Sequence, residues 1–483
     1  MAGVLAAELG EAAGRPAPGK SAAKVLEETT ASAERKLYSS YRPAHKRAIL
    51  TLCGFISLIT PFCDTIYLPS LPDVAVSLQT TAELTATSVS SYLFAVGVGQ
   101  LLWGSISDRF GRSVVLYSAL AVYEAITIGI IFVQSIDQLI VLRVLQGLFV
   151  GSTIVSAQAI ASDVFEPSER GAAMGTVFLF LLIGPVIAPI VGGVLSEAFG
   201  WRATFITLAA LTAPIALPSI AIIPETSFFL VLLRTRSGSK RGACVEPEAL
   251  PLSADEAALD LRPALQMPHD ALLLLLEAEL LPYYIGTSVT FAAMFTSLTM
   301  LPLALAAEPY SLGASNIGFC YIPVGVLMLV GSMYGGPLSD HSSRVFALAP
   351  DGRMALPLAG FYICCAGSVA FGFCLGYRAP LAALLFSHAL LGFGQALLMP
   401  STMGYLSIVR QRKSAAACAV LTFLCFCLAG ASVTVSVEAS AAMGVEAFFL
   451  VLGLLCLLVG GLCTAAVASR LRAAHRSSYD EAV

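Results

Sequence analysis

The sequence predicts an all-α membrane protein whose helices cross the bilayer twelve times, and two observations carry this prediction. Hydrophobic residues make up 57% of the 483 positions and charged residues only 12%, which is too apolar for a water-soluble globule. In addition, twelve apolar runs each approach the roughly 20 residues that a helix needs to cross about 30 Å of hydrocarbon.

One long polar stretch divides the apolar runs into two sets of six. We therefore expect an amino-terminal tail at 1–47, a first half at 48–223, a central linker at 224–282, a second half at 283–468 and a carboxy-terminal tail at 469–483. The predicted spans are 48–70, 84–106, 113–133, 138–161, 171–197, 203–223, 283–306, 315–337, 354–376, 380–405, 415–437 and 445–468.

Lysine and arginine predict the orientation, because these residues concentrate in cytoplasmic loops. With a cytoplasmic amino terminus, all but three of the 27 Lys and Arg lie inside. The three others are Arg202 and Arg378 in outer loops and Arg143 within a span. Both termini are therefore expected in the cytoplasm. The plasma membrane is the expected location, and a vacuolar or other internal membrane stays open.

Composition and motifs also exclude several classes of function. A clustered basic face that would bind nucleic acid is missing from the sequence, and so is a Walker loop that would bind nucleotide. Cysteine, histidine and carboxylate residues do not gather into a metal-ligand or nucleophile pattern. We therefore expect a monomer that is not an enzyme, that needs no cofactor or metal, and whose partners are lipid, a small molecule and protons.

The second predicted half repeats a feature of the first. The second span ends in Gly104-Ser-Ile-Ser-Asp108, and the eighth ends in Gly336-Pro-Leu-Ser-Asp340. A weaker echo relates Gln146-Gly147 in the fourth span to Gln395-Ala396 in the tenth. Such internal repeats are typical of secondary transporters, whose substrate site lies between the repeats near the membrane midplane.

Five motifs, placed in order along the chain, resemble those of the major facilitator superfamily. The resemblance extends over about residues 48–470 and is closest to the 12-span drug:proton antiporters of the Bcr/CflA and fungal quinidine-resistance type. It implies two pseudo-symmetric six-helix halves and proton-coupled export of small amphipathic or cationic compounds by alternating access. A proton-coupled importer, or a channel or non-transporting sensor on the same fold, remains an alternative. The motifs are IYLPSLP at 66–72, GSISDRFGR at 104–112, LIVLRVLQG at 139–147, GPVIAPIVGG at 184–193 and GFCYIPVG at 318–325.

Two opposite charges inside the spans are the candidates for proton coupling. Counted from the cytoplasmic ends of their helices at about 1.5 Å per residue, Asp64 lies about 24 Å and Arg143 about 27 Å into the membrane. The resemblance implies that both helices line the cavity. Burial favours a neutral carboxyl and a nearby cation favours an ionised one, so Asp64 is the expected proton acceptor and Arg143 its modulator. The alternative is a static ion pair.

Five polar side chains are candidate substrate contacts, because they lie on helices that the resemblance places around the cavity. Hydrogen bonding between helices explains such residues equally well, and the sequence does not decide between the two roles. The five are Tyr67, Gln146, Tyr321, His388 and Gln395.

The motifs also contain candidate gating residues. Gly104 allows close helix approach, Gly111 a tight turn, and Asp108 can accept hydrogen bonds from amides at a helix start. We expect Arg109 and Arg112 to form a cytoplasmic latch with Asp163 in the outward-facing state. In the second half we expect a weaker latch that involves Asp340 and Arg344.

The fifth predicted span carries a small-residue face and two prolines. Gly184, Ala188 and Gly192 recur at every fourth residue, a spacing that lets a neighbouring helix approach closely. Pro185 and Pro189 each remove a backbone donor. The resemblance implies that this face, together with Gly193, meets the second half and closes the outer side. Packing without gating is the alternative.

Overall fold

The prediction of twelve membrane-spanning helices is confirmed by the computed structural model. It describes residues 42–166, 169–226, 272–277, 279–346, 351–410 and 414–480, and within these ranges all regular elements are helical. Twelve helical segments there are long and apolar enough to cross a membrane. Most of the predicted amino-terminal tail and most of the central linker lie outside the described residues.

The first half contains six of these segments, and its first helix continues through a short 3-10 turn into a small helix. Its elements are α3 (Pro43–Thr65), η1 (Leu68–Ser70), α4 (Leu71–Ser77), α5 (Ala82–Phe110), α6 (Arg112–Ile131), α7 (Ile136–Val164), α8 (Arg170–Phe199) and α9 (Arg202–Ile222).

The second half repeats this arrangement, with a short helix before its second span. Its last helix continues past the predicted boundary at residue 468. The elements are η4 (Leu273–Leu276), α12 (Leu281–Ala306), α13 (Ala314–Phe319), α14 (Ile322–Phe346), η5 (Asp351–Met354), α15 (Ala359–Gly376), α16 (Leu381–Val409), α17 (Ser414–Met443) and α18 (Val445–Asp480).

Short connections follow from local chemistry at the helix ends. Gly111 has φ of 109°, a conformation that favours glycine, and it joins α5 to α6 without any further loop residue, as predicted. Thr81 and Ser135 are the N-cap residues of α5 and α7, and each side-chain oxygen accepts a hydrogen bond from a backbone N–H in the first turn. These caps and turns make consecutive helices antiparallel neighbours.

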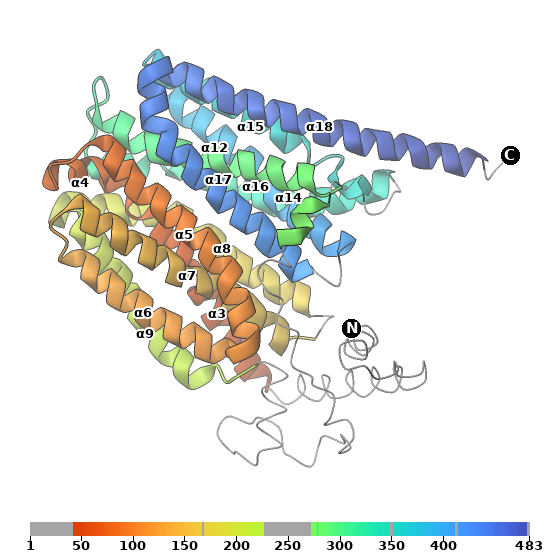
Figure 1. Ribbon diagram of the computed structural model, residues 1–483, viewed down its shortest axis with the longest axis horizontal. Coiled ribbons are helices and arrows are strands. Elements are labelled where there is room, and N and C mark those ends of the chain that lie inside the picture. The colour runs from red at the N-terminus through yellow and green to blue at the C-terminus, as the bar shows by residue number, and fades with distance from the viewer. Residues whose placement is uncertain are drawn as a thin grey trace, which may run out of the picture.

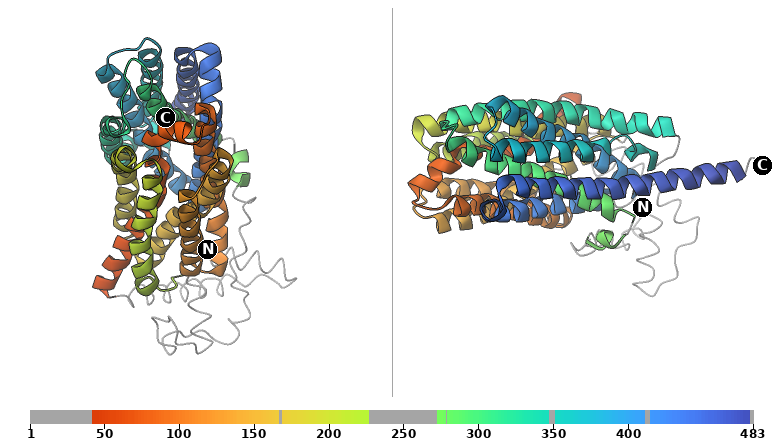
Figure 2. Two further views of the ribbon diagram at one scale, coloured as in Figure 1. Left: turned by 90° about the vertical axis from the view of Figure 1, so that its left-hand side faces the viewer. Right: turned by 90° about the horizontal axis from the view of Figure 1, so that it is seen from above.

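The two halves lie side by side, with the first half in red to yellow-green and the second in green to blue (Figure 1). The left view of Figure 2 shows the same division into two bundles. Helices α5 and α8 of the first half pack against α17 and against α13 and α14 of the second. We call this contact between the halves the seam.

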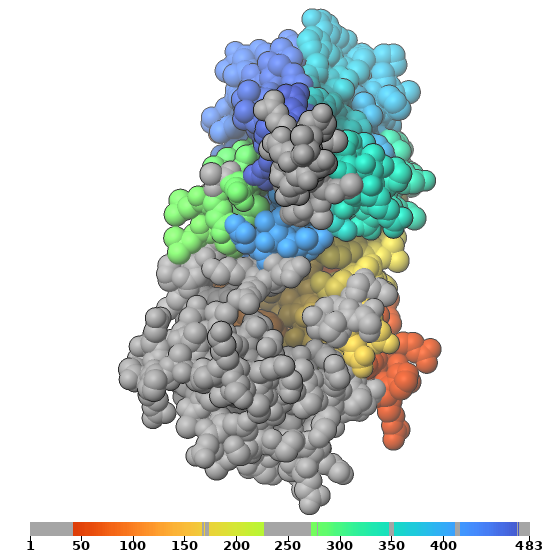
Figure 3. All heavy atoms as spheres, turned by 90° about the vertical axis from the view of Figure 1, so that its right-hand side faces the viewer, coloured from red at the N-terminus to blue at the C-terminus, as the bar shows by residue number. Residues whose placement is uncertain are grey.

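The two ends of the bundle differ in charge. We call the end where α3 begins the basic end, and Figure 3 looks onto it. The opposite end is called the acidic end. The basic end carries Arg42, Lys46, Arg47, Arg109, Arg112, Arg344, Arg353 and Arg410 together with the acids Asp108, Asp163, Glu169, Glu225, Glu277 and Asp340. The acidic end carries Asp73, Glu83, Asp137, Glu197, Glu308, Glu438 and Glu446 with two cations, Arg202 and Arg378. The names therefore refer to where the cations concentrate.

Candidate functional site

Asp64 and Arg143 both lie buried in the interior of the first half, as their depth in the sequence predicts. Asp64 is near the end of α3 and is 4% exposed, and Arg143 on α7 is fully buried. The two side chains are close enough to interact electrostatically. In this described part of the chain, however, no ion pair within 4.0 Å joins the carboxylate to the guanidinium. The static ion pair that the sequence left open as the alternative is therefore not formed in this conformation.

Aromatic rings surround the Arg143 guanidinium in place of a carboxylate. Its central carbon lies 3.9 Å from the centre of the Tyr92 ring, 5.2 Å from that of Tyr67 and 5.9 Å from that of Phe205. Cations over aromatic faces are stabilised by about 2 kcal/mol or more when water is excluded. These three rings come from α5, the α3–η1 turn and α9, so four helical segments meet at one charge. We call Arg143 with these three rings the arginine cage.

Polar contacts fix the orientation of the caged guanidinium. Its Nη1 donates to Gln146 Oε1 at 2.8 Å and to Cys63 Sγ at 3.6 Å. Gln146 in turn donates from Nε2 to Thr127 Oγ1 on α6 at 2.9 Å. Arg143 Nε and Nη2, and Asp64 Oδ1, have no hydrogen-bond partner among the described residues. The cage thus holds the cation in place while leaving hydrogen-bonding capacity on both charged groups.

The candidate substrate contacts divide between the two halves. Tyr67 and Gln146 belong to the surroundings of Arg143, and the Tyr67 hydroxyl lies 3.2 Å from Ser88 Oγ. In the second half the Tyr321 hydroxyl donates to the Leu298 carbonyl at 2.6 Å. These three side chains therefore use their polar groups to join helices in this conformation.

His388 and Gln395 lie on α16 in the second half. The His388 ring is fully buried, 5.4 Å from the Phe371 ring and 6.3 Å from the Tyr321 ring between centres. Neither of its ring nitrogens has a partner among the described residues. Gln395, which is 4% exposed, lies seven residues, or about 10 Å, further along the helix. Tyr321 and His388 are thus brought together, whereas Gln395 lies apart from them.

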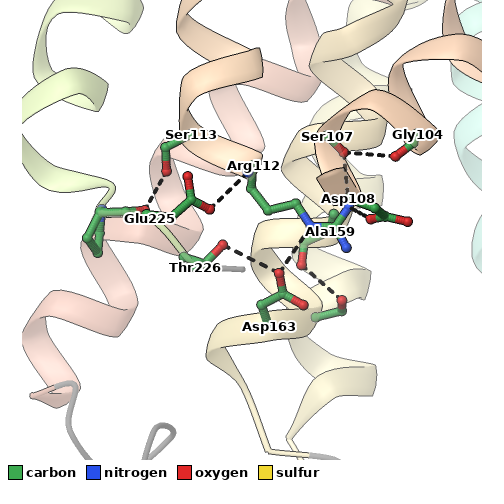
Figure 4. A network of polar contacts seen from close by, with 11 residues as sticks. Gly104, Ser107, Asp108, Arg112, Ser113, Ala159, Asp163, Glu225 and Thr226 are labelled. Carbon is green, nitrogen blue, oxygen red and sulfur yellow. Dashed lines mark hydrogen bonds and ion pairs between the residues drawn. The ribbon is translucent and has the colours of Figure 1, made fainter. Parts of the chain in front are cut away.

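At the basic end, Arg112 is the centre of a polar network (Figure 4). Its side chain pairs with Asp108, and its Nε lies 3.3 Å from Asp163 Oδ2. The backbone N–H of Arg112 donates to Glu225 Oε1 at 2.9 Å, and the Thr226 hydroxyl donates to Asp163. The ends of α5 and α7, the start of α6 and the segment after α9 are therefore joined, all within the first half.

The other arginine of the motif, Arg109, does not share this network. It lies over the Phe110 ring at 5.5 Å and pairs with no acid in the described ranges. In the second half Asp340 pairs with Arg353 at 2.7 Å, whereas Arg344 is exposed. The expectation that Asp340 acts with Arg344 was therefore wrong for this conformation, because η5 brings Arg353 to the end of α14.

The small-residue face of α8 meets a different neighbour from the one expected. A Cβ atom at Gly184 would lie 2.9 Å from Pro61, and one at Gly192 would lie 1.9 Å from the Ile66 carbonyl oxygen. Both neighbours belong to the first half. The face that crosses the seam is the adjacent one, where a Cβ at Gly193 would lie 2.4 Å from the Ala314 carbonyl oxygen. The two faces are next to each other because one residue turns an α-helix by about 100°.

The seam is closed at the acidic end. Glu197 Oε2 at the end of α8 accepts a hydrogen bond from the Ser315 backbone N–H at 2.7 Å, and this bond joins the halves. A pocket of about 560 Å³ lies outside this contact, and Asp73, Glu197, Trp201 and Arg202 are among its lining residues. Asp64 and Arg143 do not line it, so the pocket is separate from the arginine cage.

Sequence reasoning missed several residues of these two sites. Tyr92 and Phe205 of the arginine cage look like ordinary apolar positions in predicted spans. Tyr92 could have been found by depth, since it lies 18 residues before the end of α5, which places it near the level of Arg143. Glu225 follows the sixth predicted span, in a segment where the sequence offered no candidate gating residue. Its role follows from its contact with α6, which the sequence does not reveal.

The described groups around Asp64 and Arg143 do not form a metal site. Among the described residues, no group of three or more His, Cys, Asp or Glu side chains is placed to hold a metal ion. Asp64 and the arginine cage together combine a carboxyl, a fixed cation, phenol hydroxyls and aromatic faces in a buried interior. That combination suits a site in which protonation changes the local charge.

Comparisons with known proteins agree with this architecture. The family model described as "Major Facilitator Superfamily" matches residues 53–434. The chain is similar to the "Multidrug transporter QDR2" of Candida glabrata, with 26% identity over 75% of this chain and 71% of that one. It is also similar to the "MFS antiporter QDR1" of Candida albicans, with 25% identity over 90% of both chains.

Solved structures share the fold. The xylose transporter XylE from E. coli, in a partially occluded inward open conformation, matches with a TM-score of 0.64. The match covers 86% of this chain and 96% of XylE at 14% sequence identity.

Proposed function

The chain belongs to the major facilitator superfamily, and we propose that it is a proton-coupled antiporter that exports small amphipathic or cationic organic compounds by alternating access. The names of the similar proteins, a multidrug transporter and an antiporter, support the export of drug-like compounds. The proposal assigns no covalent chemistry to the chain. Protons moving down their gradient drive the substrate in the opposite direction.

The observation that carries the proposal is the pairing of a buried carboxyl with a caged arginine. Asp64 is almost fully excluded from water, and Arg143 is near it without an ion pair. Burial favours a neutral carboxyl, whereas a closer cation or access to water favours an ionised one. A change of conformation that alters either condition therefore loads or releases a proton. We assign Asp64 as the proton acceptor and Arg143 as its modulator.

Alternating access requires that the halves close at one end while they open at the other. Here the acidic end is closed by Gly193 against Ala314 and by Glu197 bonded to Ser315. We propose that the basic end is cytoplasmic, as the distribution of Lys and Arg supports. The conformation described is then the one closed to the outside. The chain is proposed to act as a monomer in the plasma membrane, with both termini in the cytoplasm.

The sequence placed the contact of Arg112 with Asp163 in the outward-facing state, but it is formed in the conformation described here, which is closed to the outside. Arg112→Ala is therefore expected to shift the conformational equilibrium toward the outward-facing state. The change removes the bonds to Asp108 and Asp163 that organise the inner surface of the first half, while the backbone N–H to Glu225 stays. Partly exposed ion pairs contribute about 1 kcal/mol, so the shift should be a few-fold. The distance between spin labels at exposed Glu169 and Val345, across the basic end, should shorten.

Arg109→Ala is the matched control, because it removes an arginine from the same motif but outside the network. It should move the label distance much less than Arg112→Ala does. Equal distances in Arg112→Ala and the unaltered chain would contradict the latch.

A substrate panel tests the proposed function directly. The full chain is produced in a host that lacks its own pumps, and loss of preloaded amphipathic and cationic dyes is measured with and without a proton uncoupler. We expect faster loss of some dyes, and we expect the uncoupler to abolish the difference. Uncoupler-sensitive accumulation of a compound would instead show an importer, and no change for any compound of this class would contradict export.

A further inference from the structure

Tyr92 lies beside both charged groups of the site, the Arg143 guanidinium and the Asp64 carboxyl. Its ring lies 3.9 Å beneath the Arg143 guanidinium. Gly147, one turn along α7, makes this approach possible, because a Cβ there would lie 2.5 Å from the Tyr92 carbonyl oxygen and 3.2 Å from ring atom Cδ2. Gly147, the last residue of the motif at 139–147, therefore leaves the space that the Tyr92 ring occupies.

The Tyr92 hydroxyl is buried and has no hydrogen-bond partner in the described part of the chain. It nevertheless lies within interaction range of the Asp64 carboxyl, whose Oδ1 is also without a partner. A buried polar group without a hydrogen bond costs about 1–3 kcal/mol of stability. Such a group therefore needs an explanation, and a hydrogen bond that forms in another conformation is one. The Tyr67 hydroxyl differs in this respect, because it is paired with Ser88.

The other titratable groups around Tyr92 come from several helices. Cys63 on α3 and Tyr123 on α6 interact with each other beside Asp64 and Arg143. Helix α17, which packs along α5, places Cys427 near Gly97, more than one turn from Tyr92. Arg143 lies over the Tyr92 ring, and Asp64 is an acid that interacts with its hydroxyl.

We infer that Tyr92 is a positioning residue for proton coupling. Its ring holds Arg143 in place, and its hydroxyl donates a hydrogen bond to the Asp64 carboxylate in the conformation that releases the proton. The phenol keeps its own proton, so no proton passes through it. Hydrogen bonds to charged groups are stronger than neutral ones, so the bond forms preferentially when Asp64 is ionised. The inference rests on the proposed function, because it needs Asp64 as the proton acceptor.

Tyr92→Phe tests the inference because it keeps the ring and removes the hydroxyl. The probe is a dye that the chain exports, and its binding to the purified full chain is measured as a function of pH. Because protons compete with the substrate, binding falls at low pH. Without the hydroxyl, the carboxylate loses a stabilising bond, and the midpoint of that fall should move to higher pH by about one unit.

Two controls separate this role from a general effect on the cage. Tyr67→Phe removes a hydroxyl that is bonded to Ser88, so its midpoint should stay in place even where affinity falls. In the Asp64→Asn background, Tyr92→Phe should cause no further shift.

A ring-fluorinated tyrosine at position 92 is a second test that applies even if the phenylalanine variant folds poorly. Its hydroxyl donates a stronger hydrogen bond at nearly the same side-chain shape, so it should move the midpoint to lower pH.

The outcomes distinguish the inference from the proposed function. If Asp64→Asn loses proton-driven transport but neither Tyr92 variant moves the midpoint, the inference is overturned and the proposed function stands. If Asp64→Asn keeps normal proton-driven transport, the proposed function falls, and the inference falls with it. Opposite shifts in the two Tyr92 variants, absent in Tyr67→Phe, support the inference.

Discussion

Asp64→Asn is expected to abolish proton-driven transport while leaving the protein folded. The amide matches the carboxylate in size, and Asp64 makes no ion pair within 4.0 Å that the change would break. The asparagine side chain cannot take up and release a proton, so a pH gradient should no longer accelerate efflux. Downhill exchange of substrate for substrate should persist, because that step needs no proton. Flux in proteoliposomes, with and without an imposed pH gradient, measures both quantities.

Glu124→Gln provides the matched control for this change. Glu124 is another carboxyl within a span of the first half, but it lies half-buried on α6, and its Oε2 has no partner among the described residues. The same carboxyl-to-amide change there should preserve acceleration by the pH gradient. Normal acceleration in Asp64→Asn would exclude Asp64 as the coupling acid. Loss of acceleration in Glu124→Gln alone would move that role to α6.

Gly193→Ala is expected to open the seam at the acidic end and to slow transport. The added Cβ would lie 2.4 Å from the Ala314 backbone carbonyl oxygen, and backbone cannot move aside as a flexible side chain can. Overpacking of this kind costs about 1–3 kcal/mol, which corresponds to a population change of roughly 5-fold to 150-fold. The cost applies only when the seam is closed, so the outward-open state gains population.

The measurement is the distance between spin labels at exposed Ser77 and Asn316, on opposite sides of the seam. The distance should lengthen in Gly193→Ala. Gly175→Ala is the control on the same helix, because a Cβ there meets no atom within 4 Å. A distance in Gly193→Ala that equals the control would contradict the assignment of this contact as the outer gate.

The number of spans was predictable because the thickness of the bilayer fixes the length of each apolar run. All twelve predicted spans coincide with helices. Most boundaries differ by five residues or fewer, but the eighth span continues nine residues further, to Phe346. The largest difference is at the last helix, which continues to Asp480. A polar sequence that follows an apolar span can remain helical, because helix propensity depends on residue type and many polar residues have a high one.

The site was predictable only in part, because depth can be counted along a sequence but rotation about the helix axis cannot. Asp64 and Arg143 stand out as charges in apolar spans, and counting residues places them at one level. Tyr92 carries no charge and lies among apolar residues, so its sequence does not show which way it faces. The same limit explains α8, where the sequence shows small residues at every fourth position but not which helix lies opposite them.

The central claim is that proton movement and substrate movement are coupled in opposite directions. The most direct test uses the purified full chain in proteoliposomes, with a compound identified in the dye panel. An outward substrate gradient imposed at uniform pH should drive protons inward, with a rate that saturates with substrate and is lost in Asp64→Asn. Substrate flux that neither saturates nor moves protons would contradict the account.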